Sequence, residues 1–182
     1  MYPMIDVFLK PQKYNLYKEV NSFPAGNLLE IGVGNGKYLH LYQNHKITGI
    51  DISSRMLKIA QKQEVYDIRL VQMNGEHLLF SDHHFDYIVV SHTITVVDNP
   101  EKLFQEMYRV LKPTGHIFIL NHFTPKNWLR YLDLGFHRIS RILHFKSKFR
   151  IEDIASIKKF NLIKEIEYKP LSYFKLLIYS KT

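Results

Sequence analysis

Short apolar runs alternate along the chain with segments whose apolar residues recur every three or four positions. The run Phe85–Ser91 is apolar at almost every position, which is typical of a strand buried on both faces of a parallel sheet. Residues 46–51 alternate instead around Ile47 and Ile50, which is the period of a half-buried strand. These patterns predict strands at residues 27–31, 46–51, 68–73, 85–91, 116–120, 162–168 and 174–180.

Helices are predicted between several of these strands. Ser53 can cap a helix that runs to Gln61, because its side chain can accept from the first free N–H groups. Asn99 and Pro100 begin another helix, since the N–H that proline lacks has no partner at the first helical position. Weaker patterns predict helices at 14–20, starting over 37–43, and at 151–160.

Strands that alternate with helices define an α/β protein. We predict an open, mostly parallel seven-stranded sheet with a C-terminal antiparallel hairpin and helices on both faces. Residues 1–26 form an N-terminal helical arm, and residues 27–182 form a single domain with a basic aromatic insertion at about 124–150. Ligands of such sheets bind beyond the carboxyl ends of the strands, so polar residues at these ends are candidate site residues.

Composition excludes several classes of protein. The chain has 182 residues, of which 46% are hydrophobic and 23% charged, as expected of a globular domain. It has no cysteine, which excludes disulfides, thiolate catalysis and cysteine-bound metal. No apolar run approaches the roughly 20 residues that span a bilayer, and residues 1–6 lack the pattern of a signal peptide. We therefore expect a cytoplasmic protein, and the spacing of its histidines and acids predicts no metal site.

The net charge of +8 is concentrated in one segment. Residues 126–150 carry seven lysines and arginines against Asp133 alone, and five aromatic residues lie among them. Basic and aromatic residues together suit an anionic membrane surface or a nucleic acid. The alternative is a core helix with a solvated basic face.

Three kinds of ligand compete for the glycine-rich loop 32–36. A triphosphate loop requires a glycine at position 31 and Ser or Thr after Lys37, and the chain has Ile31 and Tyr38 there. A dinucleotide loop requires a third glycine at position 37, although Asp51 lies at a suitable distance for a ribose. S-adenosylmethionine needs neither feature. Glycines at alternate positions let the backbone approach it closely.

Four motifs occur in order, namely EIGVGNG at 30–36, GIDIS at 49–53, FDYIVVS at 85–91 and RVLKPTG at 109–115. Together they resemble the class I S-adenosylmethionine-dependent methyltransferases over about residues 27–120. The resemblance implies a Rossmann-like fold, the cofactor S-adenosyl-L-methionine and the product S-adenosyl-L-homocysteine. It implies that the cofactor lies against Glu30, Gly32, Gly34, Gly36, Asp51, Ile52, Met56, Asn74, Gly75, Glu76, Ser91 and His92. Of these, Glu30 would orient the ammonium group, Asp51 would accept both ribose hydroxyls, and Asn74 would lie beside the adenine.

Beyond that core, residues 95–100 (TVVDNP), 121–123 (NHF) and the basic aromatic segment resemble the soluble bacterial phosphatidylethanolamine N-methyltransferases. The resemblance implies substrate contacts from Asn121, His122, Arg138 and Arg141, and a peripheral place at the inner membrane face. Two departures stand out. Asn74 replaces the family's aspartate, although its oxygen can still accept from adenine, and the N-terminal region that forms a membrane-binding lid helix in the family is short here.

An amine must be neutral before it can attack a methyl group, so a nearby base helps. His92 and His122 follow the carboxyl ends of two strands and are the candidate catalytic residues, since histidine titrates near neutral pH. Each could instead have a structural role. Methylation of a soluble small molecule at N, O or C, methylation of nucleic acid, and an inactive cofactor-binding module remain alternatives. The sequence at the end of the predicted strand at 85–91 is Ser91-His92-Thr93-Ile94, which disfavours nucleic acid as the substrate. The oligomeric state is open.

Overall fold

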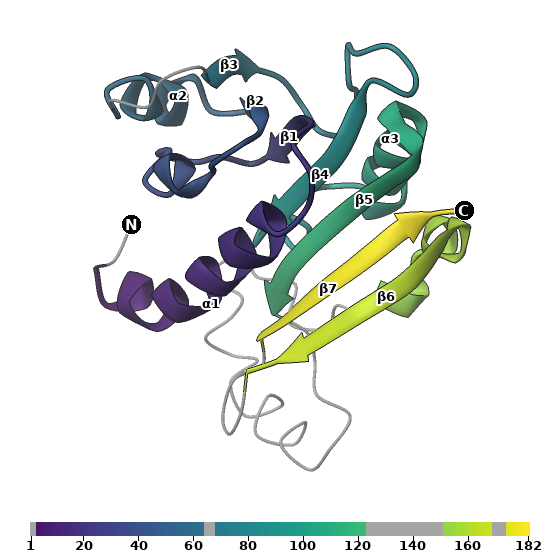
Figure 1. The fold of residues 1–182 in the computed structure, drawn as a ribbon. Helices are drawn as coiled ribbons and strands as arrows, with labels where there is room; N and C mark the ends of the chain where they lie inside the picture. The colour runs from purple at the N-terminus through teal and green to yellow at the C-terminus, as the bar shows by residue number, and fades with distance from the viewer. Residues whose placement is uncertain (1–2, 64–67, 123–150, 169–173) are drawn as a thin grey trace.

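The computed structural model describes residues 3–63, 68–122, 151–168 and 174–182. Their strands form one seven-stranded sheet in the order β3-β2-β1-β4-β5-β7-β6 (Figure 1). The strands are β1 (Asn27–Ile31), β2 (Lys46–Asp51), β3 (Ile68–Gln72), β4 (Phe85–Ser91), β5 (Leu111–His122), β6 (Phe160–Glu167) and β7 (Phe174–Lys181).

The sheet is parallel from β3 to β5 and antiparallel beyond it. The last strand, β7, lies between β5 and β6, so β6 forms the edge of the sheet. This arrangement confirms the predicted fold class. The chain moves outward from β1 through β2 to β3 and then returns to β4 on the other side of β1. The carboxyl ends of β1 and β4 therefore meet at a topological switch point, where α/β sheets bind ligands.

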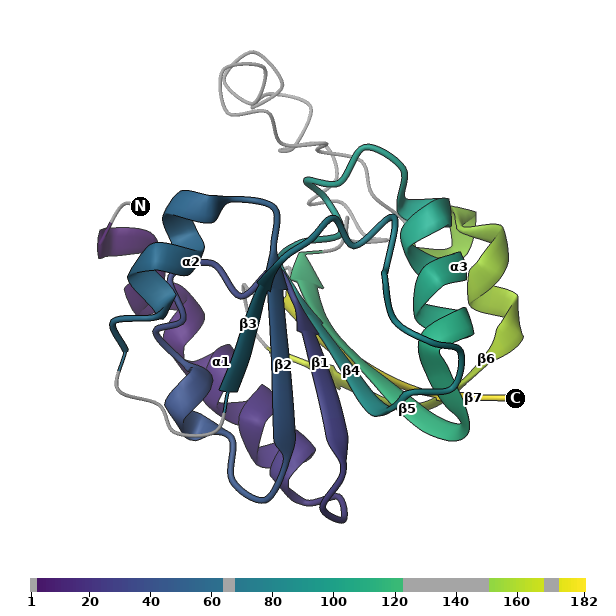
Figure 2. The same cartoon turned by 90° about the horizontal axis from the view of Figure 1, so that it is seen from above.

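Helices cover both faces of the sheet, as Figure 2 shows. On one face, α1 (Pro3–Asn21) and α2 (Ser54–Ala60) contribute Leu16, Tyr17, Val20 and Leu57 to a core with the sheet. On the other face, α3 (Pro100–Val110) buries Leu103, Phe104, Met107 and Val110. Helix α1 thus shares a core with the domain that follows it. No helix in the described part of the chain is long and apolar enough to cross a membrane.

Both predicted helix caps are present. The Ser53 side chain accepts from the Met56 N–H at the start of α2. The Asn99 side chain accepts from the Lys102 N–H at the start of α3, and Pro100 occupies the first turn. These caps depend only on neighbouring residues, which is why the sequence was sufficient to predict them.

Four predicted elements differ from the structure in type or by more than two residues at an end. The segment 37–43 forms only a 3-10 turn at Leu39–Leu41, and 151–160 forms two such turns, at Ile151–Asp153 and Ala155–Lys159. Helix α1 is longer than predicted and continues through Pro11. Strand β5 begins at Leu111, directly after α3, because residue 111 already pairs with Phe85 of β4. For β5, pairing with β4 outweighs local propensity.

Asp86 has a structural role at the amino ends of the strands. Its carboxylate accepts from the Asn27 N–H at 2.9 Å and from Lys112 Nζ at 2.7 Å. Burial alone would raise the pKa of Asp86, but these two donors outweigh it and hold the pKa below its usual range. The residue joins β1, β4 and β5 at the edge opposite to the glycine loop.

Candidate cofactor and methyl-transfer site

The glycine loop follows β1 directly, and its three glycines have positive φ angles of 82°, 56° and 71° at Gly32, Gly34 and Gly36. Such angles are unfavourable for other residues. The N–H groups of Gly32 and Val33 donate to the Ile50 carbonyl at 2.8 and 3.1 Å, which fastens the loop to β2. The loop conformation is therefore determined by glycine and by the neighbouring strand.

The three glycines meet different surroundings. A Cβ at Gly32 would lie 2.1 Å from Thr93 Oγ1, and one at Gly36 would lie 2.7 Å from Ala60 Cβ in α2. Those two glycines allow the loop after β4 and helix α2 to pack closely. A Cβ at Gly34 would meet nothing within 4 Å. The middle glycine therefore presents bare backbone to open space, where a ligand can approach it.

Asp51 stands at the carboxyl end of β2 and is held by two backbone donors. Its Oδ2 accepts from the Gly34 N–H at 2.8 Å, and its Oδ1 accepts from the Ser53 N–H at 2.8 Å. Each carboxylate oxygen keeps a further lone pair, so the group can still accept two hydroxyls. The glycine loop thus orients the acid that the sequence assigns to the ribose.

Glu30 lies at the end of β1 and is only 3% exposed. Its Oε2 accepts from the Tyr42 hydroxyl at 2.8 Å, and Tyr17 of α1 is also hydrogen-bonded to it. Burial raises the pKa of Glu30, while the charge of Lys13 and the two hydroxyls act in the opposite direction. Burial and the carboxylate raise the pKa of both tyrosines, so they remain protonated donors.

These two tyrosines hold Glu30 and are not among the site residues predicted from the sequence. Neither of them lies in one of the four motifs. The two rings meet edge to face with centroids 4.6 Å apart. Thr93 was missed as well, although its hydroxyl donates to the Ile31 carbonyl at 3.2 Å and joins the ends of β1 and β4.

The turn after β3 brings Asn74, Gly75 and Glu76 to the same edge. Asn74 Oδ1 accepts from the Glu76 N–H at 2.9 Å, which orients the side-chain amide. Glu76 is buried, and its Oε1 accepts from the Asn99 N–H at 3.0 Å. Its observed contact therefore fastens this turn to the start of α3. A Cβ at Gly75 would lie 2.8 Å from Ile31, so this glycine permits close packing beneath the site.

Two apolar residues adjoin Asp51. Ile52 is 69% exposed, and Met56 in the first turn of α2 is half-buried. An exposed isoleucine next to an ordered carboxylate offers a surface for a flat base. Their contact with cofactor stays a prediction.

The carboxyl end of β4 is strained and polar. Ser91 is buried, and its Oγ has no hydrogen-bond partner among the described residues. His92 has φ 57°, a left-handed conformation that is uncommon outside glycine and is found at functional sites. Its N–H donates to the Leu120 carbonyl at 2.8 Å, so β5 holds it in this conformation.

The structure brings the two candidate histidines to one corner. The ring of His92 meets the ring of Phe174 edge-on with centroids 5.3 Å apart, and the backbone of His122 pairs with Phe174 in the β5–β7 ladder. Asn121 is only 1% exposed and follows Ile117 and Ile119 on the α3 face. Arg138 and Arg141 lie outside the described residues. The described residues contain no group of three His, Asp or Glu side chains placed to hold a metal ion.

The residues at this edge fit S-adenosylmethionine. Open backbone at Gly34, the ordered carboxylate of Asp51 and the orphaned hydroxyl of Ser91 offer hydrogen bonds that a polar ligand can take up. Glu30 adds a buried carboxylate near the loop, which suits an ammonium group. When bound there, this cofactor supplies an electrophilic methyl group. Fold and site together define a class I methyltransferase.

Comparison with known proteins agrees with this class. A family model described as "Methyltransferase domain" matches residues 29–119. The phosphatidylethanolamine N-methyltransferase of Cereibacter sphaeroides is 32% identical over 166 residues, which are 86% of this chain and 81% of the relative. The chain belongs to the S-adenosylmethionine-dependent methyltransferase family.

Two further similarities bear on cofactor and acceptor. The ubiquinone/menaquinone biosynthesis C-methyltransferase UbiE of Psychromonas ingrahamii is 36% identical over 88 residues, which cover 46% of this chain and 35% of the relative. The N-methyltransferase NodS of Bradyrhizobium japonicum, solved in complex with S-adenosyl-L-homocysteine, superposes with a TM-score of 0.73 at 16% identity, covering 95% of this chain and 87% of that one. The protein is thus an S-adenosylmethionine-dependent methyltransferase.

Proposed function

We propose that the protein N-methylates an amine headgroup of the phosphatidylethanolamine type at a membrane surface. The observation that carries the proposal is the extent of similarity to the Cereibacter enzyme. Because 86% of this chain aligns with it, the alignment must include segments outside the cofactor-binding core at 29–119. Similarity in these segments carries information about the acceptor that a shared cofactor-binding fold does not.

The chemistry of the β4–β5 corner supports an amine acceptor. An ethanolamine nitrogen is protonated at neutral pH and must lose a proton before it attacks. His92 is half-buried, its imidazole lies edge-on to the ring of Phe174, and its backbone N–H donates to the Leu120 carbonyl where the strand ends meet. We assign it the role of proton acceptor, with His122 as the alternative because its backbone pairs with the same phenylalanine.

A membrane-bound acceptor is supported by the sequence of residues 126–150. Their seven basic side chains suit anionic lipids, and Trp128 suits the headgroup level. The segment lies outside the described residues, so this support comes from its composition alone.

The test is transfer of a radiolabelled methyl group from S-adenosylmethionine to vesicles. We expect label in the phosphatidylethanolamine of mixed vesicles and none when phosphatidylcholine is the sole lipid. Asp51→Ala serves as the control that loses cofactor. His92→Asn should lower turnover by roughly 100-fold or more, since general-base catalysis contributes that much, and asparagine tolerates the left-handed conformation. Label found only in soluble amines would contradict the lipid acceptor.

A second candidate is C-methylation of a quinone precursor, which the similarity to UbiE favours. That similarity covers 46% of this chain, about the extent of the cofactor-binding core. It therefore carries less information about the acceptor than the longer alignment does. Offering a prenylated quinol in the same vesicles separates the two candidates by which lipid acquires the label.

A further inference from the structure

The outer face of α2 carries a stripe of basic side chains. Arg55 and Lys58 belong to the helix, and Lys62 follows in the turn that continues it through the Lys62 N–H to Ile59 carbonyl bond. With 100° per residue, the three positions fall within about 60° of one another around the helix axis. All three are exposed, while Leu57 and Ala60 are buried on the opposite side of the helix.

These charges are not neutralised within the described part of the chain. The ion pairs there join other cations, such as Lys112, Lys164 and Lys175, to acids, and none of them includes Arg55, Lys58 or Lys62. Residues 52–63 contain no acidic residue. Asp51 and Glu64 flank this range, so the three cations still leave a net positive charge on this part of the chain, which attracts an anionic partner.

The neighbours of these charges favour a membrane over a nucleic acid. Ile59 lies beside the stripe, about 40° around the helix axis from Arg55, and is 37% exposed, whereas no aromatic residue occurs between 52 and 63. Single-stranded nucleic acids are bound by basic grooves with aromatic stacking platforms. Basic side chains with an apolar residue between them suit the interface of an anionic bilayer.

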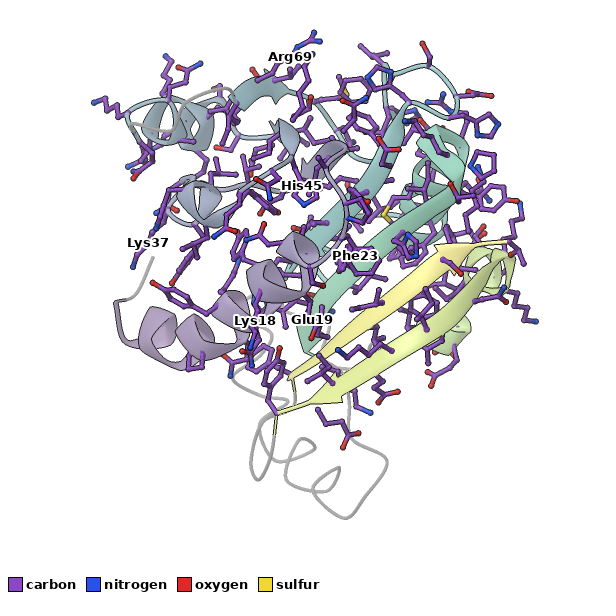
Figure 3. All side chains as sticks on the ribbon, viewed as in Figure 1. Lys18, Glu19, Phe23, Lys37, His45 and Arg69 are labelled. Carbon is purple, nitrogen blue, oxygen red and sulfur yellow. The ribbon has the colours of Figure 1, made fainter. Side chains whose placement is uncertain are left out.

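We propose that the stripe of Arg55, Lys58 and Lys62, with Ile59 beside it, docks the protein on an anionic membrane surface. The inference deepens the proposed lipid-methylating function and rests on it. Helix α2 begins just after Asp51 at the carboxyl edge of the sheet, on the same side of the molecule as α1 (Figures 1 and 2). Lys37, labelled in Figure 3, extends this basic side beyond the glycine loop. Docking here would place the carboxyl end of β2, where Asp51 lies, on the membrane side of the protein.

Vesicle binding by the full chain tests this surface. The variant carries Arg55→Gln, Lys58→Gln and Lys62→Gln together. The control carries Lys46→Gln, Lys102→Gln and Lys158→Gln, which remove the same charge from the amino end of β2, from α3 and from the 3-10 turn before β6. Vesicles of phosphatidylcholine with 30% phosphatidylglycerol are sedimented at about 0.1 M salt, and cofactor affinity is measured by calorimetry.

We expect the stripe variant to bind these vesicles at least tenfold more weakly than the control variant, because each basic residue near an anionic surface contributes to binding. Cofactor affinity should match the parent, which shows that the variant is folded. Equal vesicle binding by the two variants overturns the proposal of a docking surface on α2, even if the parent protein methylates ethanolamine lipid. If the stripe variant loses vesicle binding but the parent protein methylates no lipid, the docking surface stands and the proposed acceptor is wrong. Salt-dependent RNA binding that the stripe variant loses, with unchanged vesicle binding, assigns the surface to nucleic acid and overturns the proposal.

Discussion

The hydrogen bond from Tyr42 to Glu30 leads to a specific prediction about the stability of the folded protein and its dependence on pH. Tyr42→Phe keeps the edge-to-face contact with Tyr17 and removes only the hydroxyl that donates to Glu30 Oε2 at 2.8 Å. The carboxylate is 3% exposed, so water cannot readily replace the lost donor. A hydrogen bond to a buried charged group contributes about 1.5–3 kcal/mol, against about 0.5–1.5 kcal/mol for a neutral one.

The sign of the pH effect follows from Glu30. Burial raises its pKa, so the folded state binds more protons than the unfolded state between the ordinary carboxyl pKa and the raised one. Stability therefore falls as pH rises through this window. Removing the Tyr42 donor raises the pKa further and widens the window. The substitution should destabilise the protein by roughly 1 kcal/mol at pH 5 and by about 2 kcal/mol or more at pH 8, where the carboxylate is ionised.

Urea unfolding followed by circular dichroism at pH 5 and pH 8 measures this difference. Tyr14→Phe is the matched control, because it removes a hydroxyl from a side chain of α1 that is 45% exposed. We also expect weaker binding of S-adenosylmethionine by Tyr42→Phe, since Glu30 then holds a proton more often. The reasoning is refuted if Tyr42→Phe is no more destabilised than Tyr14→Phe, or if its loss of stability is equal at the two pH values.

Three other predictions test separate parts of the protein. Asp51→Ala should weaken binding of S-adenosylmethionine by about 30-fold or more in calorimetry, since a charged hydrogen bond contributes roughly 2 kcal/mol; parental affinity would contradict the ribose assignment. Burial lowers the pKa of His116, so the folded protein loses stability as pH falls below about 6.5, where the unfolded chain takes up the proton more readily. His116→Phe should reduce the loss of urea stability between pH 7.5 and pH 5.5, and an unchanged loss would show that His116 does not cause it. Arg138→Gln with Arg141→Gln should weaken sedimentation with anionic vesicles while cofactor affinity stays at the parental value; a loss of cofactor affinity instead would place these arginines at the cofactor.

Elements with local causes could be predicted from the sequence. The run Phe85–Ser91 is apolar throughout because β4 has neighbours on both sides and helices on both faces. The caps at Ser53 and Asn99 lie next to the N–H groups that they satisfy. The segment at 37–43 was predicted to begin a helix and forms a single 3-10 turn, in which Leu39 packs under α1 and Tyr42 reaches Glu30. Its long-range contacts outweigh its helix propensity.

The sequence by itself contained the four motifs that indicate the family and, through it, the cofactor. Glycines at 32, 34 and 36 allow left-handed backbone, and Asp51 follows at the end of the next strand, so local chemistry predicts a close backbone approach by the ligand and an acid that can accept ribose hydroxyls. Only the tertiary structure decided which glycine is open to space and which groups hold the acids. Thr93 fills the space above Gly32 from 61 residues away in the chain, and tyrosines from α1 and the 3-10 turn hold Glu30. Such contacts join residues that are distant in sequence, and packing alone brings them together.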